Sequence, residues 1–125
     1  MSKPTIEKIT VIGGGSTYTP ELIDGFIQHE PDLQVNEIAL YDIDEERLNV
    51  VGGMAQRQVQ YAELNTKVTL NMNRPKAVDG AKFVLSSMRI GHMAARILDE
   101  KIPLKYNVIG LSGRFPSAPD IPSFW

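Results

Sequence analysis

Short apolar runs alternate with longer amphipathic stretches along most of the chain. The runs at residues 8–12, 38–41, 68–72 and 83–87 are rich in β-branched and large aliphatic side chains. Runs this short, next to Gly, Asp or Asn, are typical of buried β-strands. Strands that alternate with helical segments predict an α/β fold built on a parallel sheet.

The stretch after the first run predicts a helix with one apolar face. Thr19 suits the N-cap, Pro20 suits the first helical position, and Pro31 closes the segment. Apolar side chains recur at three- and four-residue spacing between them, at Leu22, Ile23, Phe26 and Ile27.

Two more helices and one helical turn follow. Asp44 suits the N-cap of a helix that continues through Gly52 and Gly53, although each glycine costs about 1 kcal/mol relative to alanine. Residues 75–78 predict one helical turn, and residues 90–104 predict a last helix that Pro103 ends or kinks. The methionines are predicted to fill gaps in the core, at Met54, Met72, Met88 and Met93.

Composition narrows the class of protein. The chain has 125 residues, a formal net charge of −2 and no Cys. This length fits one domain, and the charge argues against nucleic acid as a partner because phosphate binding needs a basic surplus. The absence of Cys excludes a disulfide framework, a thiolate metal site and a Cys nucleophile. No apolar run is long enough for a membrane span, and no secretory signal opens the chain, so we expect a soluble cytoplasmic protein.

A glycine-rich turn joins the first strand to the first helix. Gly13 and Gly15 occupy the first two glycine places of a G-x-G-x-x-G nucleotide fingerprint, and Tyr18 stands at the third. In such a turn the backbone approaches a diphosphate, and the N–H groups at the start of the helix face the anion. Ser16 and Thr17 add hydroxyls that reach phosphate oxygens. The alternative is a tight connection without a ligand.

Asp42 follows the second strand, somewhat further beyond the glycines than the roughly 20 residues typical of the fingerprint. A carboxylate there binds the ribose hydroxyls and favours NAD over NADP, because it repels a 2′-phosphate. The alternative is that Asp42 or Asp44 only caps the next helix. Both roles are compatible if Asp44 is the cap and Asp42 the ribose ligand.

Polar residues also follow the fourth strand, where the cleft of a doubly wound sheet lies. Ser86 and Ser87 end this strand, and Arg89 follows them two residues later. A guanidinium suits a substrate phosphate or carboxylate. The alternative is a surface Arg that pairs with Asp99 or Glu100.

Four motifs together resemble glycoside hydrolase family 4, in its 6-phospho-β-glucosidase branch. They are ITVIGGGSTYTPEL at residues 9–22, YDID at 41–44, MRIG at 88–91 and DEKIPLKYNVIG at 99–110. The resemblance covers residues 5–110. It implies a Rossmann-like doubly wound parallel sheet, and the family has no third glycine where Tyr18 stands.

The resemblance implies a function as well. The family uses NAD and a divalent metal, usually manganese, and cleaves phosphorylated disaccharides or glucosides by oxidation and elimination, outside the two-carboxylate scheme. By analogy, Gly13, Gly15 and Ser16 hold the diphosphate and Asp42 the adenosine ribose. Arg89 would bind the sugar 6-phosphate. Thr17 and Ser87 complete the expected cofactor-binding set.

After Gly110 the sequence departs from the family and continues with a Pro-rich tail, starting LSGRFP at residues 111–116. The family's Cys and His metal ligands and its proposed Tyr base have no counterpart here, so no catalytic or metal-binding residue is assigned. We therefore expect a partial NAD-binding domain at residues 1–110 and a divergent tail at 111–125, as in a frameshifted or truncated product, without glycosidase activity of its own. The alternatives are a non-catalytic NAD-binding module and a fragment of a lactate/malate-type dehydrogenase.

A truncated parallel sheet also predicts self-association. An open apolar edge at the fourth strand would pair with another copy, giving a homo-oligomer. The tail offers a second way to cover this edge, because it carries the apolar residues Phe115, Phe124 and Trp125.

Overall fold

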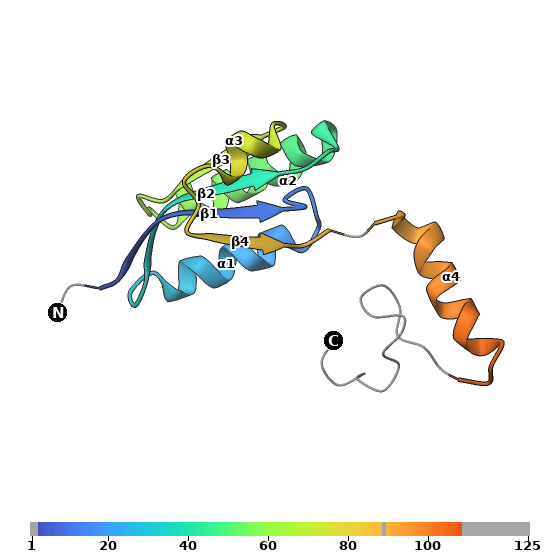
Figure 1. Cartoon of the computed structure of the whole chain (residues 1–125). Helices are drawn as coiled ribbons and strands as arrows, with labels where there is room; N and C mark the ends of the chain where they lie inside the picture. Colours follow the sequence, from blue (N-terminus) through green and yellow to red (C-terminus); the bar gives the residue numbers. More distant parts are fainter. Residues whose placement is uncertain (1–2, 89, 109–125) are drawn as a thin grey trace. The chain divides into compact units, whose positions relative to one another are not determined.

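The computed structural model describes residues 3–88 and 90–108, and it divides the chain into two compact units, Met1–Met88 and Arg89–Trp125. The predicted boundary at residue 110 and the tail at 111–125 lie outside the described residues, so the division into 1–110 and 111–125 stays a prediction. The elements of the first unit are β1 (Thr5–Ile12), α1 (Thr19–His29), β2 (Gln34–Tyr41), α2 (Glu45–Tyr61), β3 (Lys67–Asn71), α3 (Arg74–Val78) and β4 (Phe83–Ser86) (Figure 1).

The four strands form one parallel sheet in the order β3-β2-β1-β4. β1 lies in the centre, between β2 and β4, so the chain reverses its direction of travel across the sheet at β1. This is the strand order of the first half of a Rossmann fold, and the glycine turn leaves from the carboxyl end of β1, at the switch point. The predicted fold class is confirmed.

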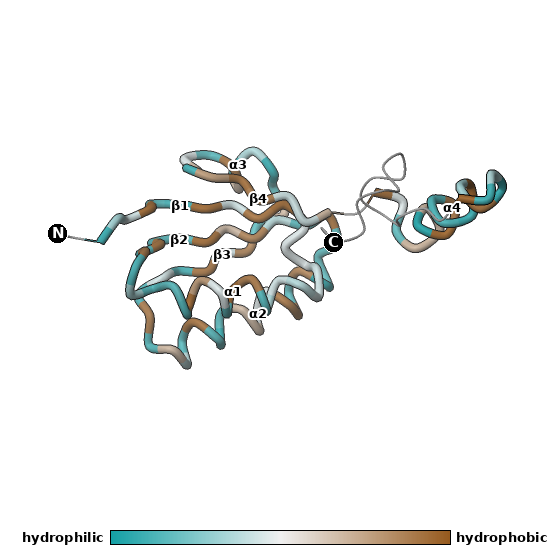
Figure 2. Tube along the Cα trace, turned by 90° about the horizontal axis from the view of Figure 1, so that it is seen from below, coloured by the Kyte–Doolittle hydropathy of each residue, from teal (hydrophilic) through white to brown (hydrophobic). Residues whose placement is uncertain are grey.

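One face of the sheet carries the core. Ile9 and Val11 of β1 lie beside Ile38 and Leu40 of β2, and partners in parallel register share a face. This face packs against buried side chains of α1 and α2, namely Ile23, Leu48, Ala55 and Val59. Figure 2 shows α1 and α2 on one side of the strands and α3 on the other.

The opposite face of the sheet carries polar as well as apolar side chains and is partly covered by α3. The buried Thr10 hydroxyl donates a hydrogen bond to the carbonyl oxygen of Ala77. Lys8 Nζ donates to the carbonyl oxygens of Lys76, at 3.2 Å, and Asp79, at 2.8 Å. Buried polar groups require such partners, so these hydrogen bonds help to hold α3 against β1.

The helix limits confirm some predictions and correct others. Asp44 caps α2 by accepting a 3.0 Å hydrogen bond from Arg47 N–H, and the helix runs unbroken through both glycines. Thr19 is not the N-cap of α1, which is a correction: the cap position is Tyr18, without a side-chain cap. The buried Thr19 hydroxyl instead donates to the carbonyl oxygen of Gly14, at 2.8 Å. This acceptor lies inside the glycine turn, which a local capping pattern does not reveal.

The methionines are a second correction. Met54, Met72, Met88 and Met93 keep 44, 46, 60 and 60% of their surface exposed, so they do not fill the core. Met72 and Met88 follow strands and lie in loops, where the apolar period of the strand has already ended.

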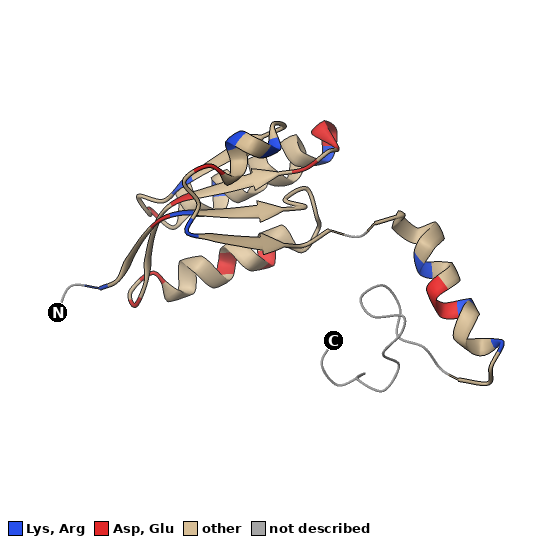
Figure 3. Cartoon of the chain, viewed as in Figure 1, with Lys and Arg blue, Asp and Glu red and all other residues tan. Residues whose placement is uncertain are grey.

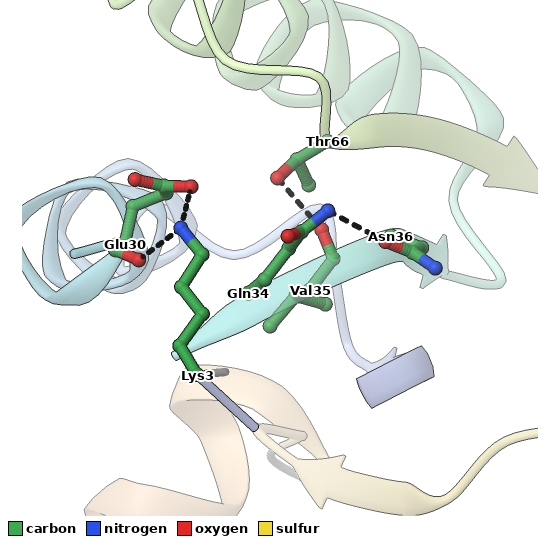
Figure 4. Close-up of polar contacts among 6 residues, drawn as sticks. All are labelled: Lys3, Glu30, Gln34, Val35, Asn36 and Thr66. Atoms are coloured by element: carbon green, nitrogen blue, oxygen red, sulfur yellow. Dashed lines mark hydrogen bonds and ion pairs between the residues drawn. The ribbon is translucent and has the colours of Figure 1, made fainter. Parts of the chain in front are cut away.

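Polar contacts stabilise the sheet at the amino-terminal ends of its strands (Figure 4). Lys3 Nζ forms an ion pair with the Glu30 carboxylate and donates to the Glu30 carbonyl oxygen at 2.9 Å. The hydroxyl of Thr66 donates to the carbonyl oxygen of Val35 at 2.7 Å, which joins the start of β3 to β2. These contacts lie at the end of the sheet away from the glycine turn, so they support the fold and take no part in the site.

The second unit holds α4 (His92–Leu104), which begins after Gly91 in a left-handed conformation, with φ of 79°. The helix starts two residues later than the pattern of residues 90–104 predicts. Pro103 lies in its last turn, as predicted, and none of the residues of α4, all of which are described, is buried. No helix in the described part of the chain combines the length and apolar character that a membrane span requires.

Candidate nucleotide-binding site

The glycine turn folds back onto the carboxyl end of β2. The N–H groups of Gly13 and Gly14 both donate to the carbonyl oxygen of Tyr41, at 2.9 and 2.8 Å. One carbonyl therefore holds two consecutive residues of the turn. Because the turn also leaves from the end of β1, it lies at the carboxyl edge of the sheet, where ligands of open α/β sheets bind.

Close contacts with the protein itself explain all three glycines. Gly13 has a φ of +88°, and a Cβ added there would lie 2.4 Å from the carbonyl oxygen of Ser87. A Cβ on Gly14 would lie 2.7 Å from Cβ of Leu40, and one on Gly15 would lie 2.9 Å from Oδ2 of Asp42. The glycines therefore allow the turn to fit between β2 and β4, and the glycine pattern alone does not reveal a ligand.

The turn can bind an anion through the backbone N–H groups that have no acceptor within the described residues. The N–H of Ser16 donates to the Gly13 carbonyl oxygen at 3.1 Å, and the N–H of Tyr18 donates to Oγ of Ser16 at 3.2 Å. Within the described residues, the backbone N–H groups of Thr17 and Glu21 have no hydrogen-bond acceptor. Thr17 is exposed, and both free donors lie at the start of α1, where the helix dipole is positive.

Asp42 is bound to the turn. Its Oδ2 accepts a 2.9 Å hydrogen bond from the N–H of Gly15, and its Oδ1 accepts a 3.0 Å hydrogen bond from the N–H of Asp44. The residue is half-buried. The side chain thus lies between the glycine turn and the start of α2, and both its oxygens already accept a backbone hydrogen bond.

Ser87 lies beside Gly13 because its N–H donates to the carbonyl oxygen of Ile12 at 2.8 Å, which extends the pairing of β4 with β1. The structure thus brings Gly13, Gly15, Asp42 and Ser87 together at the carboxyl edge, with Ser16 and Thr17 on the turn. Arg89, the expected phosphate ligand, lies outside the described residues.

Charge is scarce in the turn itself. Residues 13–18 contain no charged side chain. In the cartoon of Figure 3, Lys and Arg positions are coloured on α3 and Asp and Glu positions at the start of α2. An anion at this turn would therefore be held by backbone dipoles and hydroxyls, and not by a Lys or Arg of the turn. Among the described residues, no three His, Cys, Asp or Glu side chains gather in a way that would hold a metal ion.

The sequence does not predict two groups that shape the site, the Tyr41 carbonyl and the Thr19 hydroxyl. The carbonyl of Tyr41 organises the turn through its backbone, so its side-chain identity gives no signal. The Thr19 hydroxyl fixes the Gly14 carbonyl, and its sequence context is equally typical of a helix cap.

Strand order, glycine turn and acidic residue after β2 define a Rossmann-like α/β domain of the dinucleotide-binding type. The profile described as "Family 4 glycosyl hydrolase" matches residues 8–115. This chain belongs to family 4 of the glycosyl hydrolases, and the resemblance predicted from its four motifs is confirmed.

Named relatives agree with the family. The chain is 50% identical over 105 residues to a "Probable 6-phospho-beta-glucosidase" of Bacillus subtilis, covering 82% of this chain and 24% of the relative. It is 42% identical over 103 residues to a 6-phospho-beta-glucosidase of Thermotoga maritima, covering 82% and 24%. The chain thus spans about a quarter of the length of these curated relatives.

Solved structures show the same fold. A 6-phospho-beta glucosidase from Thermotoga maritima, solved with NAD and glucose-6-phosphate, matches with a TM-score of 0.73 and 40% identity, covering 86% of this chain and 25% of that chain. Another structure of that enzyme contains manganese as well. A lactate dehydrogenase from Cryptosporidium parvum matches with a TM-score of 0.54 at 17% identity, which shows a shared fold alone.

Proposed function

We propose that this chain forms the NAD-binding part of a 6-phospho-β-glucosidase. The observation that carries the proposal is the free N–H of Thr17, which lies in a closed glycine turn at the carboxyl edge of a parallel sheet. The family supports it, because the Thermotoga maritima relative was solved with NAD. The proposed substrate is a 6-phospho-β-glucoside, in line with the names of the relatives.

Each residue of the site has a proposed role toward NAD. The free N–H groups of Thr17 and Glu21, with the hydroxyls of Ser16 and Thr17, donate to the diphosphate oxygens. Gly13 and Gly15 keep the turn closed so that these donors face outward. Asp42 faces the adenosine ribose, where its charge disfavours a 2′-phosphate. Ser87 forms the opposite wall, beside Gly13.

The chemistry that bound NAD supplies is reversible uptake of hydride from a sugar carbon. Arg89 is proposed to bind the 6-phosphate of the sugar, as a guanidinium pairs with phosphate oxygens. The described residues do not fit a metal ion, since they contain no cluster of three ligating side chains. The described residues therefore have no metal-dependent role in the proposed reaction.

Calorimetric titration of the chain with NAD tests the proposal. We expect NAD to bind, NADP to bind more weakly, and Thr17→Ala to weaken NAD binding by about threefold to tenfold, the loss of one hydrogen bond. Thr5→Ala, an exposed Thr at the amino edge, is the matched control and should leave affinity unchanged. A chain that is folded by circular dichroism and shows no heat of NAD binding would overturn the assignment.

Turnover is measured separately. With NAD, manganese and a chromogenic 6-phospho-β-glucoside, we expect NAD binding without cleavage by this chain alone. Cleavage would show that the site is complete. NAD binding with no activity, even when the segments that relatives have beyond this stretch are supplied, would favour the alternative of a non-catalytic NAD-binding module.

Self-association is proposed at the β4 edge. Phe83 and Val84 keep 50 and 52% of their surface exposed, and β4 is the last strand on its side of the described sheet. An exposed edge strand is a template for pairing with another chain. Light scattering should report dimers or larger species, and a monomer at high concentration would contradict this.

The proposed location is the cytoplasm, because NAD and phosphorylated sugars are cytoplasmic metabolites. Neither nucleic acid nor a membrane is proposed as a partner. The formal net charge of −2 argues against a phosphate-rich polymer.

A further inference from the structure

We propose that Asp42 is a positioning residue for the phosphate-binding turn, in addition to facing the ribose. The inference rests on the proposed function, because the turn is taken to hold the diphosphate of NAD. It goes beyond that function because the same carboxylate would both hold the shape of the diphosphate site and select NAD over NADP at the adenosine ribose.

The contacts of the carboxylate carry the proposal. Oδ2 accepts from the N–H of Gly15 at 2.9 Å, and Oδ1 accepts from the N–H of Asp44 at 3.0 Å. Each oxygen therefore bonds one loop: the first belongs to the turn between β1 and α1, the second to the turn between β2 and α2. Hydrogen bonds to a charged acceptor are roughly twice as strong as neutral ones, so this bridge holds the two loops at a fixed separation.

The absence of a side chain at Gly15 supports the same conclusion. An added Cβ there would lie 2.9 Å from Oδ2 and 3.1 Å from Cγ of Asp42, closer than ordinary contact distance. Glycine at this position thus leaves room for the carboxylate and not only for a ligand. Gly15 and Asp42 form one unit, in which the missing side chain of one admits the charged side chain of the other.

The bridge has a consequence for the diphosphate donors. Because the N–H of Gly15 donates to Asp42, that group is not available to the diphosphate. The next free donor along the turn is the N–H of Thr17. Asp42 therefore determines which backbone N–H faces the diphosphate, although it does not touch the diphosphate itself.

The first test uses the chain without NAD, so it does not depend on the proposed function. Amide hydrogen exchange is measured by NMR on the wild type, Asp42→Ala, and Asp32→Ala. Asp32 is an exposed loop residue and serves as the matched control. We expect Asp42→Ala to raise the exchange rates of the Gly15 and Asp44 amides by about tenfold, because alanine offers no acceptor to either N–H group. Unchanged exchange at Gly15 would overturn the proposal.

The second test separates positioning from ribose binding. Affinities for NAD and for its analogue that lacks the adenosine 2′-hydroxyl are measured with the wild type and Asp42→Ala. If Asp42 positions the turn, the variant loses about tenfold in affinity even for the analogue, and the loss for NAD is at least as large because the ribose contact is lost as well. If Asp42 acts only on the ribose, the loss disappears with the analogue, and the proposal fails. Absence of NAD binding to the wild type would overturn the proposed function and leave the exchange result standing.

A third measurement distinguishes coupling between Gly15 and Asp42 from a general loss of stability in the variants. Gly15→Ala, Asp42→Ala and the double variant are compared by urea unfolding. The Cβ that Gly15→Ala introduces would meet the carboxylate, so removing that carboxylate should recover part of the loss. The double variant should therefore be less destabilised than the two single losses combined. Additive losses would contradict the coupling of the two residues.

Discussion

Gly13 lies against the backbone of Ser87 so closely that a Cβ on Gly13 would stand 2.4 Å from the Ser87 carbonyl oxygen. The contact joins the start of the glycine turn to the end of β4. Rotation of a side chain cannot relieve this contact, because the backbone of Gly13 fixes the position of the Cβ and the Ser87 oxygen is a backbone atom. In addition, the φ of +88° at Gly13 is unfavourable for any residue with a side chain.

Gly13→Ala should therefore destabilise the chain by at least roughly 1–3 kcal/mol from backbone strain alone. Urea unfolding followed by far-UV circular dichroism measures the effect. Gly25→Ala is the matched control: a Cβ there meets nothing within 4 Å, and the residue is inside α1, so we expect a gain of about 0.5–1 kcal/mol. Equal effects of the two variants would contradict the structure.

The neighbouring glycines of α2 should respond with opposite signs. A Cβ on Gly52 would lie 2.2 Å from Cδ2 of Leu70, so Gly52→Ala forces the core to shift and should cost up to about 2 kcal/mol despite its better helix propensity. A Cβ on Gly53 meets only the guanidinium of Arg57, at 3.5 Å, so Gly53→Ala should gain about 0.5–1 kcal/mol. Unfolding midpoints that move in the same direction would show that the helix faces are wrongly assigned.

The hydrogen bond that joins β1 to α3 can be tested at Thr10. Thr10→Val keeps the shape of the buried side chain and removes its hydroxyl, leaving the Ala77 carbonyl oxygen without that donor. We expect a loss of about 1–3 kcal/mol in the free energy of unfolding. Thr10→Ser should retain more of the stability, and Thr5→Val, at an exposed position of the same strand, should be neutral. A neutral Thr10→Val would mean that the bond contributes nothing net.

The cap of α2 is the fourth test. Asp44→Ala removes the acceptor of the Arg47 N–H and should cost about 0.5–2 kcal/mol, whereas Asp44→Asn keeps an oxygen acceptor and should be nearly neutral. Thermal unfolding of both variants decides the point. Equal destabilisation by Ala and Asn would assign the effect to the charge of Asp44 and not to the hydrogen bond.

The sequence by itself determined the elements and the class. Four short apolar runs, the glycine turn and the acidic residue after the second strand are local patterns, and each reflects a local cause such as strand burial or a turn geometry. They were sufficient to predict an α/β fold on a parallel sheet and the cap at Asp44, whereas the family was predicted from the resemblance of four motifs. The site residues Gly13, Gly15, Asp42 and Ser87 do lie at one edge of the sheet.

Only the tertiary structure decided how those residues contact one another. The sequence context of Thr19 is typical of a helix cap, but in the structure its hydroxyl donates to the Gly14 carbonyl oxygen, which the folded turn brings near. Gly52 and Gly53 are equivalent in the sequence, yet Leu70 lies beside only one of them. The sequence predicts Asp42 as a ribose ligand, but packing of β2 beside β1 places the Gly15 N–H within its reach. Long-range contacts of this kind depend on how the strands pair, and no local pattern of residues encodes their distances.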